Sequence, residues 1–488
     1  MHPLSVSPAT LPAWHATLLM LPALAAAGAA ALSRPGLSPG TAWRLAAWAS
    51  VAGIVCAVLS LAAALAGSRG TAYGVHAGAA GSVMLLLVAF VAWVIVRYSR
   101  PYLAGERHER RYVRWLMATV AAVLVVATTN DVLVLALAWS ATSLALHRLL
   151  TFFGERPAAV TAAHKKFIVS RAAELCLLAA IMLLYQAYGT LDIAAIQGHA
   201  AAEPQTPLAA QGAALLIAFA AILKCAQLPF HGWLIQVMEA PTPVSALLHA
   251  GVVNLGGFVL IRFATLLAHV PAAQVLLLVL GTATAVLAAL VMSTRISVKV
   301  MLAWSTCAQM GYMLMECGLG AWELALLHLV AHSLYKAHAF LSAGGAVRRS
   351  VLAQMAPPVP AAVLGRTLAL TLAGACVMLG AGAAWHALLG SWVAANAPTL
   401  PATAGIGVVL AFGTLFGLQA ALRLQARSTL ARRLYPWFYG GLFLDEAFSR
   451  WAFSLWRPPA PEAEANPLPS PQARLIEAKP RAASGVPA

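Results

Sequence analysis

The sequence predicts an all-α polytopic membrane protein with about thirteen to fourteen transmembrane helices. Its 488 residues are 61% hydrophobic and only 9% charged, with a mean hydropathy of +0.81. Soluble domains carry about 25% charged residues, so a chain this poor in charge could not cover its own surface in water. Apolar runs of about 20 residues, the length that crosses a bilayer, recur along the chain.

The apolar runs predict the spans, with ends placed to within about two to four residues. They cover residues 14–32, 43–66, 77–98, 112–129, 131–153, 167–187, 208–228, 243–268, 274–292, 299–317, 321–345, 361–388 and 403–424. Residues 434–456 are aromatic and charged, and predict either an amphipathic helix in the interface or a final span. The interfacial helix is favoured because it leaves the basic tail inside. Residues 457–488 are rich in Pro, Ala and charge, and predict a disordered cytoplasmic tail.

The distribution of Lys and Arg predicts the orientation. Basic residues fill alternate loops, after the first, third, fifth, ninth, eleventh and thirteenth runs, while the loops between them are almost bare apart from Arg69. The positive-inside rule then places the N-terminus outside and the C-terminus in the cytoplasm. The net charge of +16 is therefore interpreted as membrane topology rather than as a nucleic-acid-binding face.

Neither the six cysteines nor the N-terminal segment predicts a disulfide framework, a zinc site or a cleaved signal peptide. Each cysteine lies in or beside an apolar run without a CxxC pair, so we expect buried small residues and neither a disulfide framework nor a zinc site. The segment from Trp14 to Leu32 lacks a basic n-region, and we interpret it as a first span rather than a signal peptide.

Lys224 is the first candidate proton carrier. Ionisable groups inside spans are costly, so they indicate function by default. Lys224 lies near the end of the seventh run, and Pro229 follows it. A proline there breaks the helix, and broken helices are tolerated where they line a polar cavity. The alternative is a lysine whose head reaches the interface.

A second set of candidates lies on the eleventh run. His328, His332 and Lys336 are spaced i, i+4 and i+8, which places them on one helix face, while His338 lies on another. A row of titratable groups is what proton transfer along a helix requires. Two alternatives remain open: a metal site, although no carboxylate motif accompanies the histidines, and core histidines bonded to neighbouring helices.

Three further positions complete the candidate pathway. His249 follows Pro241-Thr242-Pro243 at the start of the eighth run, Glu174 lies beside Arg171 on the sixth, and His147 lies beside Arg148 on the fifth. The two arginines could instead simply mark the cytoplasmic end. Glu174 could supply a counter-charge to Lys224 from the neighbouring helix.

Three segments resemble a known family. The run that starts at Lys224-Cys225-Ala226-Gln227-Leu228-Pro229, the run Thr294–Thr306 and the run His332–Leu341 are similar to the antiporter-like subunits of respiratory complex I and of multisubunit Na⁺/H⁺ antiporters. The resemblance covers roughly residues 110–350. It implies two inverted five-helix repeats with broken helices at the seventh and twelfth spans. It also assigns family roles in proton transfer to Lys224, His249, His328, His332 and Lys336.

Two departures from that family are visible. Complex I pumps carry a glutamate just after a tryptophan on the fifth span, where this chain has Ser140 after Trp139. The twelfth span of pumping subunits is charged, whereas here His386 is the titratable group. Both departures argue against a proton-pumping mechanism of the complex I type.

Details of sequence resemble one branch, the DabB family of membrane subunits in bacterial two-component inorganic-carbon transporters. They are Phe230-His231-Gly232-Trp233, Met238-Glu239-Ala240, His147-Arg148 and Tyr335-Lys336-Ala337-His338. The resemblance implies a DabA-like partner related to β-carbonic anhydrases, with zinc in that partner and no cofactor in this chain. It also implies a multi-pass protein of the bacterial inner membrane, surrounded by lipid and without nucleic acid.

The expected organisation follows from these features. N-terminal transmembrane helices occupy 1–110, an antiporter-like core 111–433, the amphipathic or final helix 434–456 and the tail 457–488. The expected function is cation conduction, most simply of protons, that drives CO₂ or bicarbonate accumulation, so the chain is a transporter subunit and not an enzyme. The alternatives are a proton-pumping subunit of a complex I-like or Na⁺/H⁺ antiporter assembly, and a non-conducting anchor for the partner.

Overall fold

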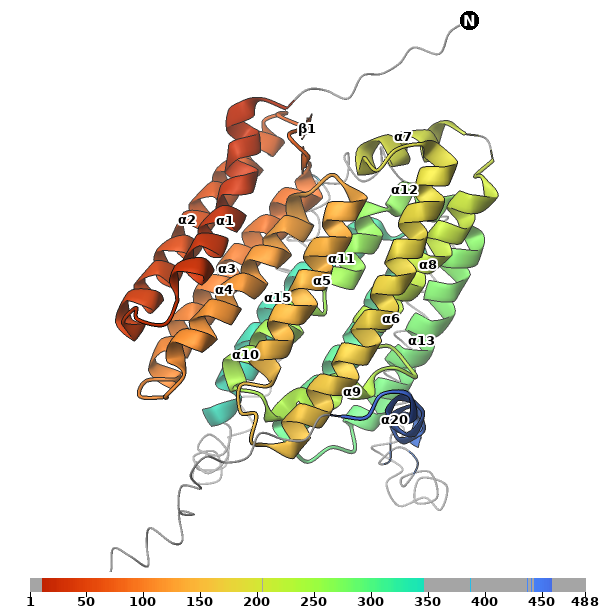
Figure 1. The fold of residues 1–488 in the computed structure, drawn as a ribbon. Coiled ribbons are helices and arrows are strands. Elements are labelled where there is room, and N and C mark those ends of the chain that lie inside the picture. The colour runs from red at the N-terminus through yellow and green to blue at the C-terminus, as the bar shows by residue number, and fades with distance from the viewer. Residues whose placement is uncertain are drawn as a thin grey trace, which may run out of the picture.

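The structure is a bundle of long helices with a small hairpin at one end (Figure 1). It is a computed structural model that describes residues 11–203, 205–345 and 443–458, together with residues 387, 437 and 440. The described elements are α1 Ala13–Leu32, α2 Pro39–Leu65, β1 Gly70–Ala72, β2 Val75–Ala77, α3 Ala79–Tyr102, α4 Glu109–Thr128, α5 Val132–Leu150, α6 Pro157–Tyr188, α7 Ile193–Ala202, α8 Leu208–Lys224, α9 Gly232–Gln236, η1 Val237–Glu239, α10 Thr242–Leu247, η2 Leu248–Val252, α11 Leu255–Arg262, α12 Ala264–Ala268, α13 Pro271–Met292, α14 Val298–Gly318, α15 Trp322–Ser342, η3 Ala343–Gly345 and α20 Leu444–Leu455.

The predicted all-α membrane fold is confirmed for the described residues. Every predicted span from 14–32 to 321–345 coincides with a helix or, for 243–268, with a series of short helices. Eight described helices or helix series are long and apolar enough to cross a bilayer, and α8 is apolar but has only 17 residues because it ends at the predicted break. The predicted spans 361–388 and 403–424, the break on the twelfth span and most of the tail lie outside the described residues.

The basic loops gather at one end of the bundle, as the positive-inside rule predicts. The loops after α1, α3, α5 and α13 lie at the end where α20 lies, whereas the hairpin, α7 and α12 lie at the opposite end (Figure 1). We therefore treat the α20 end as cytoplasmic.

One predicted boundary is wrong. The sixth span was expected to begin near residue 167, after a cytoplasmic loop with Lys165 and Lys166, but α6 begins at Pro157. Pro157 occupies the first turn, where its missing N–H costs nothing. Both lysines therefore lie in the helix and are buried. They are tolerated there because contacts distant in sequence satisfy them: Lys165 binds Asp445 and Lys166 donates to the Ser143 carbonyl.

Two elements at the outer end were not expected from the sequence. β1 and β2 pair antiparallel, and the turn between them places both Tyr73 and Gly74 in the left-handed region. The Asn130 N–H donates to the Gly74 carbonyl at 2.8 Å, which ties the hairpin to the turn between α4 and α5. α7 is a short helix capped by the Asp192 side chain.

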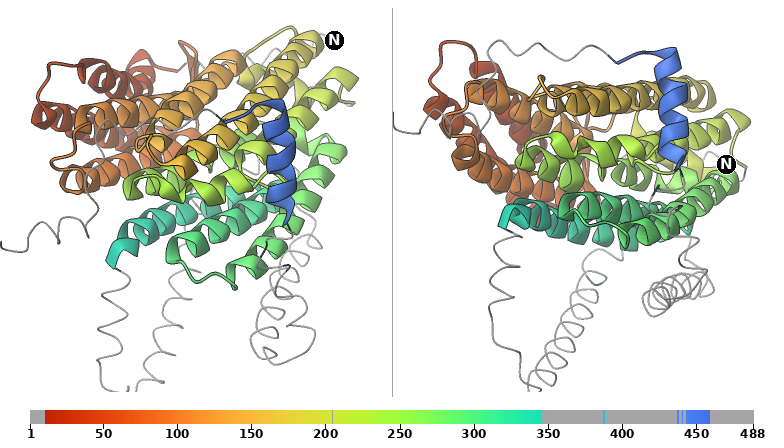
Figure 2. Two further views of the ribbon diagram at one scale, coloured as in Figure 1. Left: turned by 60° about the horizontal axis from the view of Figure 1, so that its bottom comes forward. Right: turned by 90° about the horizontal axis from the view of Figure 1, so that it is seen from below.

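Helix α20 lies crosswise to the long helices at the cytoplasmic end (Figure 2). Its 12 residues extend about 18 Å at 1.5 Å per residue, which is shorter than the roughly 30 Å hydrocarbon core. Phe448 and Ala452 face the bundle, while Trp451 and Leu455 are exposed. This segment therefore has the geometry of an interfacial helix.

Candidate functional site

The seventh span is broken directly after Lys224. α8 ends at this residue, Ala226 adopts a positive φ of 51°, and helical structure resumes only at Gly232. The freed backbone groups are partly satisfied by other elements, since the Leu228 N–H donates to Thr284 Oγ1 at 3.2 Å. Pro229 lies within this break, which places the Lys224 side chain at the end of a helix inside the bundle.

Lys224 is buried and held by three neighbours. Its Nζ donates to Ser143 Oγ at 2.6 Å and lies 3.3 Å from Glu174 Oε1. It also lies 5.3 Å from the centre of the Trp139 ring, within cation–π range. The expected contact with Glu174 is therefore present, and the alternative of a lysine reaching the interface does not fit this geometry.

The Glu174 carboxylate is shared between two cations. Its Oε1 accepts from Arg171 at 2.8 Å, on the same helix, as well as from Lys224. Lys166 lies nearby and donates to the Ser143 carbonyl at 2.7 Å. Sequence reasoning assigned Lys166 to a loop and so missed it; the helical spacing of Lys166, Ser170 and Glu174 was the signal that could have found it.

His147 lies on the last turn of α5, on the cytoplasmic side of this cluster. Its ring packs against Phe167 at 5.6 Å, and its enclosed Nδ1 has no hydrogen-bond partner within the described chain. Arg148 next to it is exposed and does not join the cluster. The structure thus brings together His147, Lys166, Lys224 and Glu174 between α5, α6 and α8.

The three candidates on α15 lie along one face, as predicted, but their surroundings differ. The Lys336 ammonium is fully buried and donates to the Leu302 carbonyl at 3.1 Å. Both ring nitrogens of His332 are buried without a partner in the described residues. His328 is bonded on both sides, to Glu316 at 3.0 Å and to Gln309 at 2.9 Å. His338 is exposed on another face, as predicted.

Glu316 is a functional candidate that the sequence analysis missed. It lies on α14 with a side chain that is 2% exposed. An isolated carboxylate inside the apolar run 299–317 was a signal that the cost of intramembrane charge makes informative. Its contact with His328 means that this histidine is satisfied by neighbouring helices, one of the alternatives that the sequence left open.

His249 lies in a local distortion of the eighth span. Leu248–Val252 form a π-helix, η2, and such single turns often occur at functional sites. The His249 ring stacks on Phe340 at 4.4 Å, yet both ring nitrogens are buried without a partner among the described residues. Buried polar atoms are normally paired with protein or water, so His249 and His332 have hydrogen-bonding capacity that the described residues leave unused.

A further polar contact that was not predicted joins the residue before α11, directly after η2, to α15. Asn254 Nδ2 donates to Ser333 Oγ at 2.6 Å and to the Ala250 carbonyl at 3.1 Å. Ser333 follows His332 in the chain. This contact therefore fixes the α15 row against the helix that carries His249.

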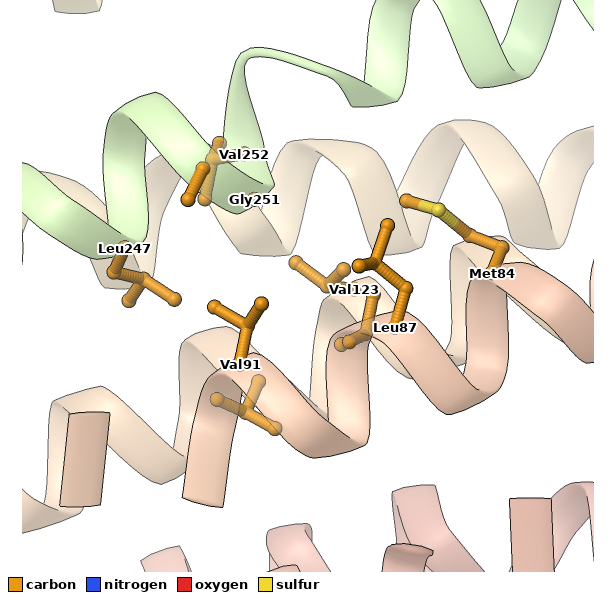
Figure 3. Close-up of a pocket in the computed structure, with 10 residues that line it drawn as sticks. Met84, Leu87, Val91, Val123, Leu247, Gly251 and Val252 are labelled. Atoms are coloured by element: carbon orange, nitrogen blue, oxygen red, sulfur yellow. The ribbon is translucent and has the colours of Figure 1, made fainter. Parts of the chain in front are cut away.

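Apolar side chains line the space between η2 and helices α3 and α4. An apolar void of about 10 Å³ lies between η2 and helices α3 and α4, lined by Met84, Leu87, Val91, Val123, Leu247, Gly251 and others (Figure 3). The residues that line this void carry no polar side chain, so they offer His249 no side-chain hydrogen bond.

Asp445 connects α20 to the broken seventh span. Its carboxylate lies 3.0 Å from Lys165 Nζ and accepts from Gln236 Nε2 at 2.8 Å. Phe448 packs edge-on against Phe230, which directly follows Pro229. The interfacial helix α20 is thus held by the cytoplasmic part of α6 and by the segment that follows the break in the seventh span.

The described residues hold no group of three or more His, Cys, Asp or Glu side chains that could bind a metal ion. His328 and Glu316 form a pair and not a ligand set. No hydrogen bond joins Lys224 to His249, because both nitrogens of His249 lack a partner in the part of the chain that the structure describes. The site therefore consists of two polar clusters. One contains His147, Lys166, Glu174 and Lys224, and the other contains His249, His328, His332 and Lys336.

Comparison with known proteins identifies the fold and its relatives. The family profile "NADH:quinone oxidoreductase/Mrp antiporter, TM" matches residues 129–386. The chain is 60% identical over 270 residues to the probable inorganic carbon transporter subunit DabB of Hydrogenovibrio crunogenus, covering 55% of this chain and 52% of that protein. It is 50% identical over 262 residues to the probable inorganic carbon transporter subunit DabB2 of Halothiobacillus neapolitanus, covering 54% and 48%. The chain thus spans about half the length of these curated relatives.

A solved structure has the same fold. A chain of the Mrp complex from Dietzia sp. DQ12-45-1b is 32% identical, with a TM-score of 0.58 over 66% of this chain and 37% of that chain. Residues 129–386 include both polar clusters, from Trp139 to Lys336. The candidate site therefore lies in the part of the chain that the family profile matches.

Proposed function

Because the chain belongs to the NADH:quinone oxidoreductase/Mrp antiporter transmembrane family, we propose that it conducts protons as the membrane subunit of an inorganic-carbon transporter. The observation that carries the proposal is the buried Lys224–Glu174 pair at the end of a broken helix. A charge at the bilayer centre costs about 2.5–3.5 kcal/mol on insertion scales. A protein retains such groups where ions or protons move.

The shared carboxylate lets Lys224 change its charge. While Lys224 is protonated, Glu174 bridges it and Arg171. When Lys224 releases a proton, Glu174 keeps the Arg171 partner and is not left as an unpaired buried charge, which would cost several kcal/mol. Glu174 in this chain thus takes the counter-charge role that Ser140 cannot fill.

The second cluster continues the route. Lys224, His249 and the row of Lys336, His332 and His328 form one route for a proton between the two sides of the membrane. Ring nitrogens without partners among the described residues suit His249 and His332 to proton uptake, while Glu316 stabilises a charged His328 at the end of the row.

The coupling to carbon rests on the relatives, whose names describe inorganic carbon transporter subunits. The proposed partner is a DabA-like protein related to carbonic anhydrase, which would hold the zinc and carry out the hydration of CO₂. A membrane potential provides about 2.3 kcal/mol per charge per 100 mV. One proton that crosses roughly 150 mV therefore provides about 3.5 kcal/mol, enough for a ratio of a few hundred in concentration.

A second function is favoured by the structural likeness to a chain of the Mrp complex. In that case the chain exchanges or pumps cations in a different assembly and has no link to carbon. The same polar clusters serve both functions, so the discriminating observation is dependence on the partner.

The test is growth in ambient air of a carbonic-anhydrase-deficient bacterium that expresses this chain. It is expressed alone, with a DabA-like partner, and with the partner plus Lys224→Ala. Rescue is expected only with the partner and is lost with Lys224→Ala at equal membrane abundance. The matched control is Lys299→Ala, because Lys299 lies at the start of α14, where it donates to Thr242 Oγ1. No rescue with an assembled complex refutes carbon coupling and leaves cation exchange.

A further inference from the structure

The cytoplasmic ends of α2 and α3 form an apolar groove with arginines at its mouth. The groove has a volume of about 480 Å³. Arg44 on α2 and Arg97 and Arg100 on α3 line it, together with Trp48, Val51 and Trp93. It lies far in the sequence from both polar clusters, and proton transfer does not use it.

The sequence builds this groove by matched spacing on two antiparallel helices. Arg44, Ala47, Trp48 and Val51 are spaced i, i+3, i+4 and i+7 on α2, so they share one face. Trp93, Val96, Arg97 and Arg100 repeat the same spacing on α3, with the arginines at the opposite end of the motif. α2 and α3 run in opposite directions (Figure 1). Arg44 near the start of α2 and Arg97 and Arg100 near the end of α3 therefore line the groove at the cytoplasmic end.

The guanidinium groups lack acidic partners in the part of the chain that the structure describes. Arg97 contacts the Trp93 ring at 5.6 Å, and neither it nor Arg100 forms an ion pair within the described residues. Arg44 donates to Thr41 Oγ1 at 3.1 Å. The nearby Glu109 carboxylate is already occupied, because it accepts from Trp43 Nε1 and from the Gly105 N–H, both at 2.9 Å. The mouth of the groove is therefore positive.

An exposed apolar track leads from this mouth into the membrane. On α2 it runs along Trp48, Val51, Val55 and Leu59, of which Trp48 is 72% exposed and Val55 52%. From Trp48 to Leu59 the track is about 16 Å long at 1.5 Å per residue. Phe90, which is 40% exposed, continues the α3 side beyond Trp93. The dimensions and polarity match one acyl chain below one headgroup.

We propose that this groove is a binding site for an anionic glycerophospholipid of the cytoplasmic leaflet. Its phosphate binds Arg44, Arg97 and Arg100, and an acyl chain lies along Trp48, Val51 and Val55. Guanidinium groups bind phosphate in a bidentate manner, and basic sites between membrane helices on the cytoplasmic side bind anionic headgroups. The bound lipid joins α2 to α3 at the edge of the bundle.

The general positive-inside charge would attract anionic lipid without any defined site, so the test compares arginines at the same end. The purified full-length chain in detergent is titrated with phosphatidylglycerol or phosphatidylcholine, and the retained lipid is counted by native mass spectrometry. The test variant is Arg97→Gln/Arg100→Gln. The matched control is Arg34→Gln/Arg156→Gln, which removes the same charge from two other loops at that end.

The expected result is one tightly retained phosphatidylglycerol per wild-type chain, with weaker retention of phosphatidylcholine. Loss of two arginines is expected to weaken retention by on the order of 25-fold, since each contributes about fivefold near an anionic surface. The control variant retains the lipid. Equal loss in both variants refutes a defined site, because it indicates attraction by overall charge.

Two further arms separate the lipid from a free anion. Trp48→Ala removes an exposed wall of the acyl track without changing charge, and is expected to weaken phosphatidylglycerol retention. Inorganic phosphate at millimolar concentration is expected not to displace the lipid. Displacement by phosphate together with unchanged retention in Trp48→Ala would show an anion pocket without an acyl site and overturn the proposal.

Discussion

The ammonium of Lys224 lies 3.3 Å from the carboxylate of Glu174 inside the membrane, although 50 residues separate them in the chain. The same carboxylate oxygen accepts from Arg171 at 2.8 Å. One acidic side chain therefore pairs with both a buried lysine and an arginine.

The first prediction concerns this pair. Glu174→Gln removes the shared negative charge and leaves two neighbouring cations to repel each other, so we expect proton flux to fall at least about tenfold, corresponding to about 1.4 kcal/mol. Glu174→Asp is expected to restore part of the flux. The measurement is dye-detected proton uptake by proteoliposomes under an imposed potential.

Glu106→Gln is the control for this experiment, because Glu106 is exposed in the loop between α3 and α4. Its flux should equal that of the wild type. Full flux in a correctly inserted Glu174→Gln variant would contradict the role given to the pair.

The second prediction separates His328 from His332. His328→Leu leaves the buried Glu316 without its histidine partner, and loss of a hydrogen bond to a charged group costs about 1.5–3 kcal/mol of stability. His332→Leu removes no hydrogen bond to the described part of the chain, so the apparent melting temperature should stay unchanged or rise, while proton flux falls. Scanning fluorimetry and the proteoliposome assay are applied to both variants.

His338→Leu is the control because His338 is exposed on another face of α15. It should change neither quantity. A strong loss of stability in His332→Leu would indicate that this histidine has a structural partner and is not a proton carrier.

The sequence predicted the order of the spans and the break after Lys224, because hydropathy and proline act locally. It also predicted the face shared by His328, His332 and Lys336, since helical spacing determines it. Glu174 as a counter-charge followed from the adjacency of helices. These features depend on short-range geometry and on the cost of charge in lipid.

Other features depend on contacts between distant segments and could not be predicted. α6 extends past Lys165 because Asp445, 280 residues later, compensates its charge. The π-helix at His249 and the Asn254–Ser333 bond depend on how the eighth span packs against α15. Glu316 was visible in the sequence, but its contact with His328 required the packing of α14 on α15.

The third prediction tests the contact between α13 and α14. A Cβ added at Gly311 would lie 2.7 Å from the Ala285 nitrogen and from the Gly281 carbonyl oxygen, both of them backbone atoms that cannot move aside cheaply. Small residues allow such close approach of membrane helices. Gly311→Ala is therefore expected to destabilise the protein by about 1–3 kcal/mol.

Gly28→Ala is the matched control, since a Cβ on Gly28 of α1 meets no atom within 4 Å. Scanning fluorimetry in detergent should show a clear decrease in melting temperature for Gly311→Ala and none for Gly28→Ala. Equal behaviour of the two variants would mean that the two helices separate easily.

The last prediction concerns pH and the hairpin at the outer end. Burial and, to a lesser degree, the nearby Arg262 guanidinium lower the pKa of His76 to about 3. An unfolded histidine has a pKa of about 6.5. Below that pH the unfolded chain binds a proton that the folded hairpin does not, so stability falls as pH decreases from about 6.5 toward 3, by at most about 1.4 kcal/mol per pH unit. The partly exposed ring makes the real slope smaller.

His76→Gln removes this proton and should flatten the fall in melting temperature between pH 7.5 and pH 5. His269→Gln is the control, because His269 is exposed in the turn before α13. If His76→Gln keeps the same pH slope as the wild type and as His269→Gln, then the acid sensitivity arises from other groups. The hairpin would in that case hold His76 in contact with water, where Arg262 could not prevent its protonation.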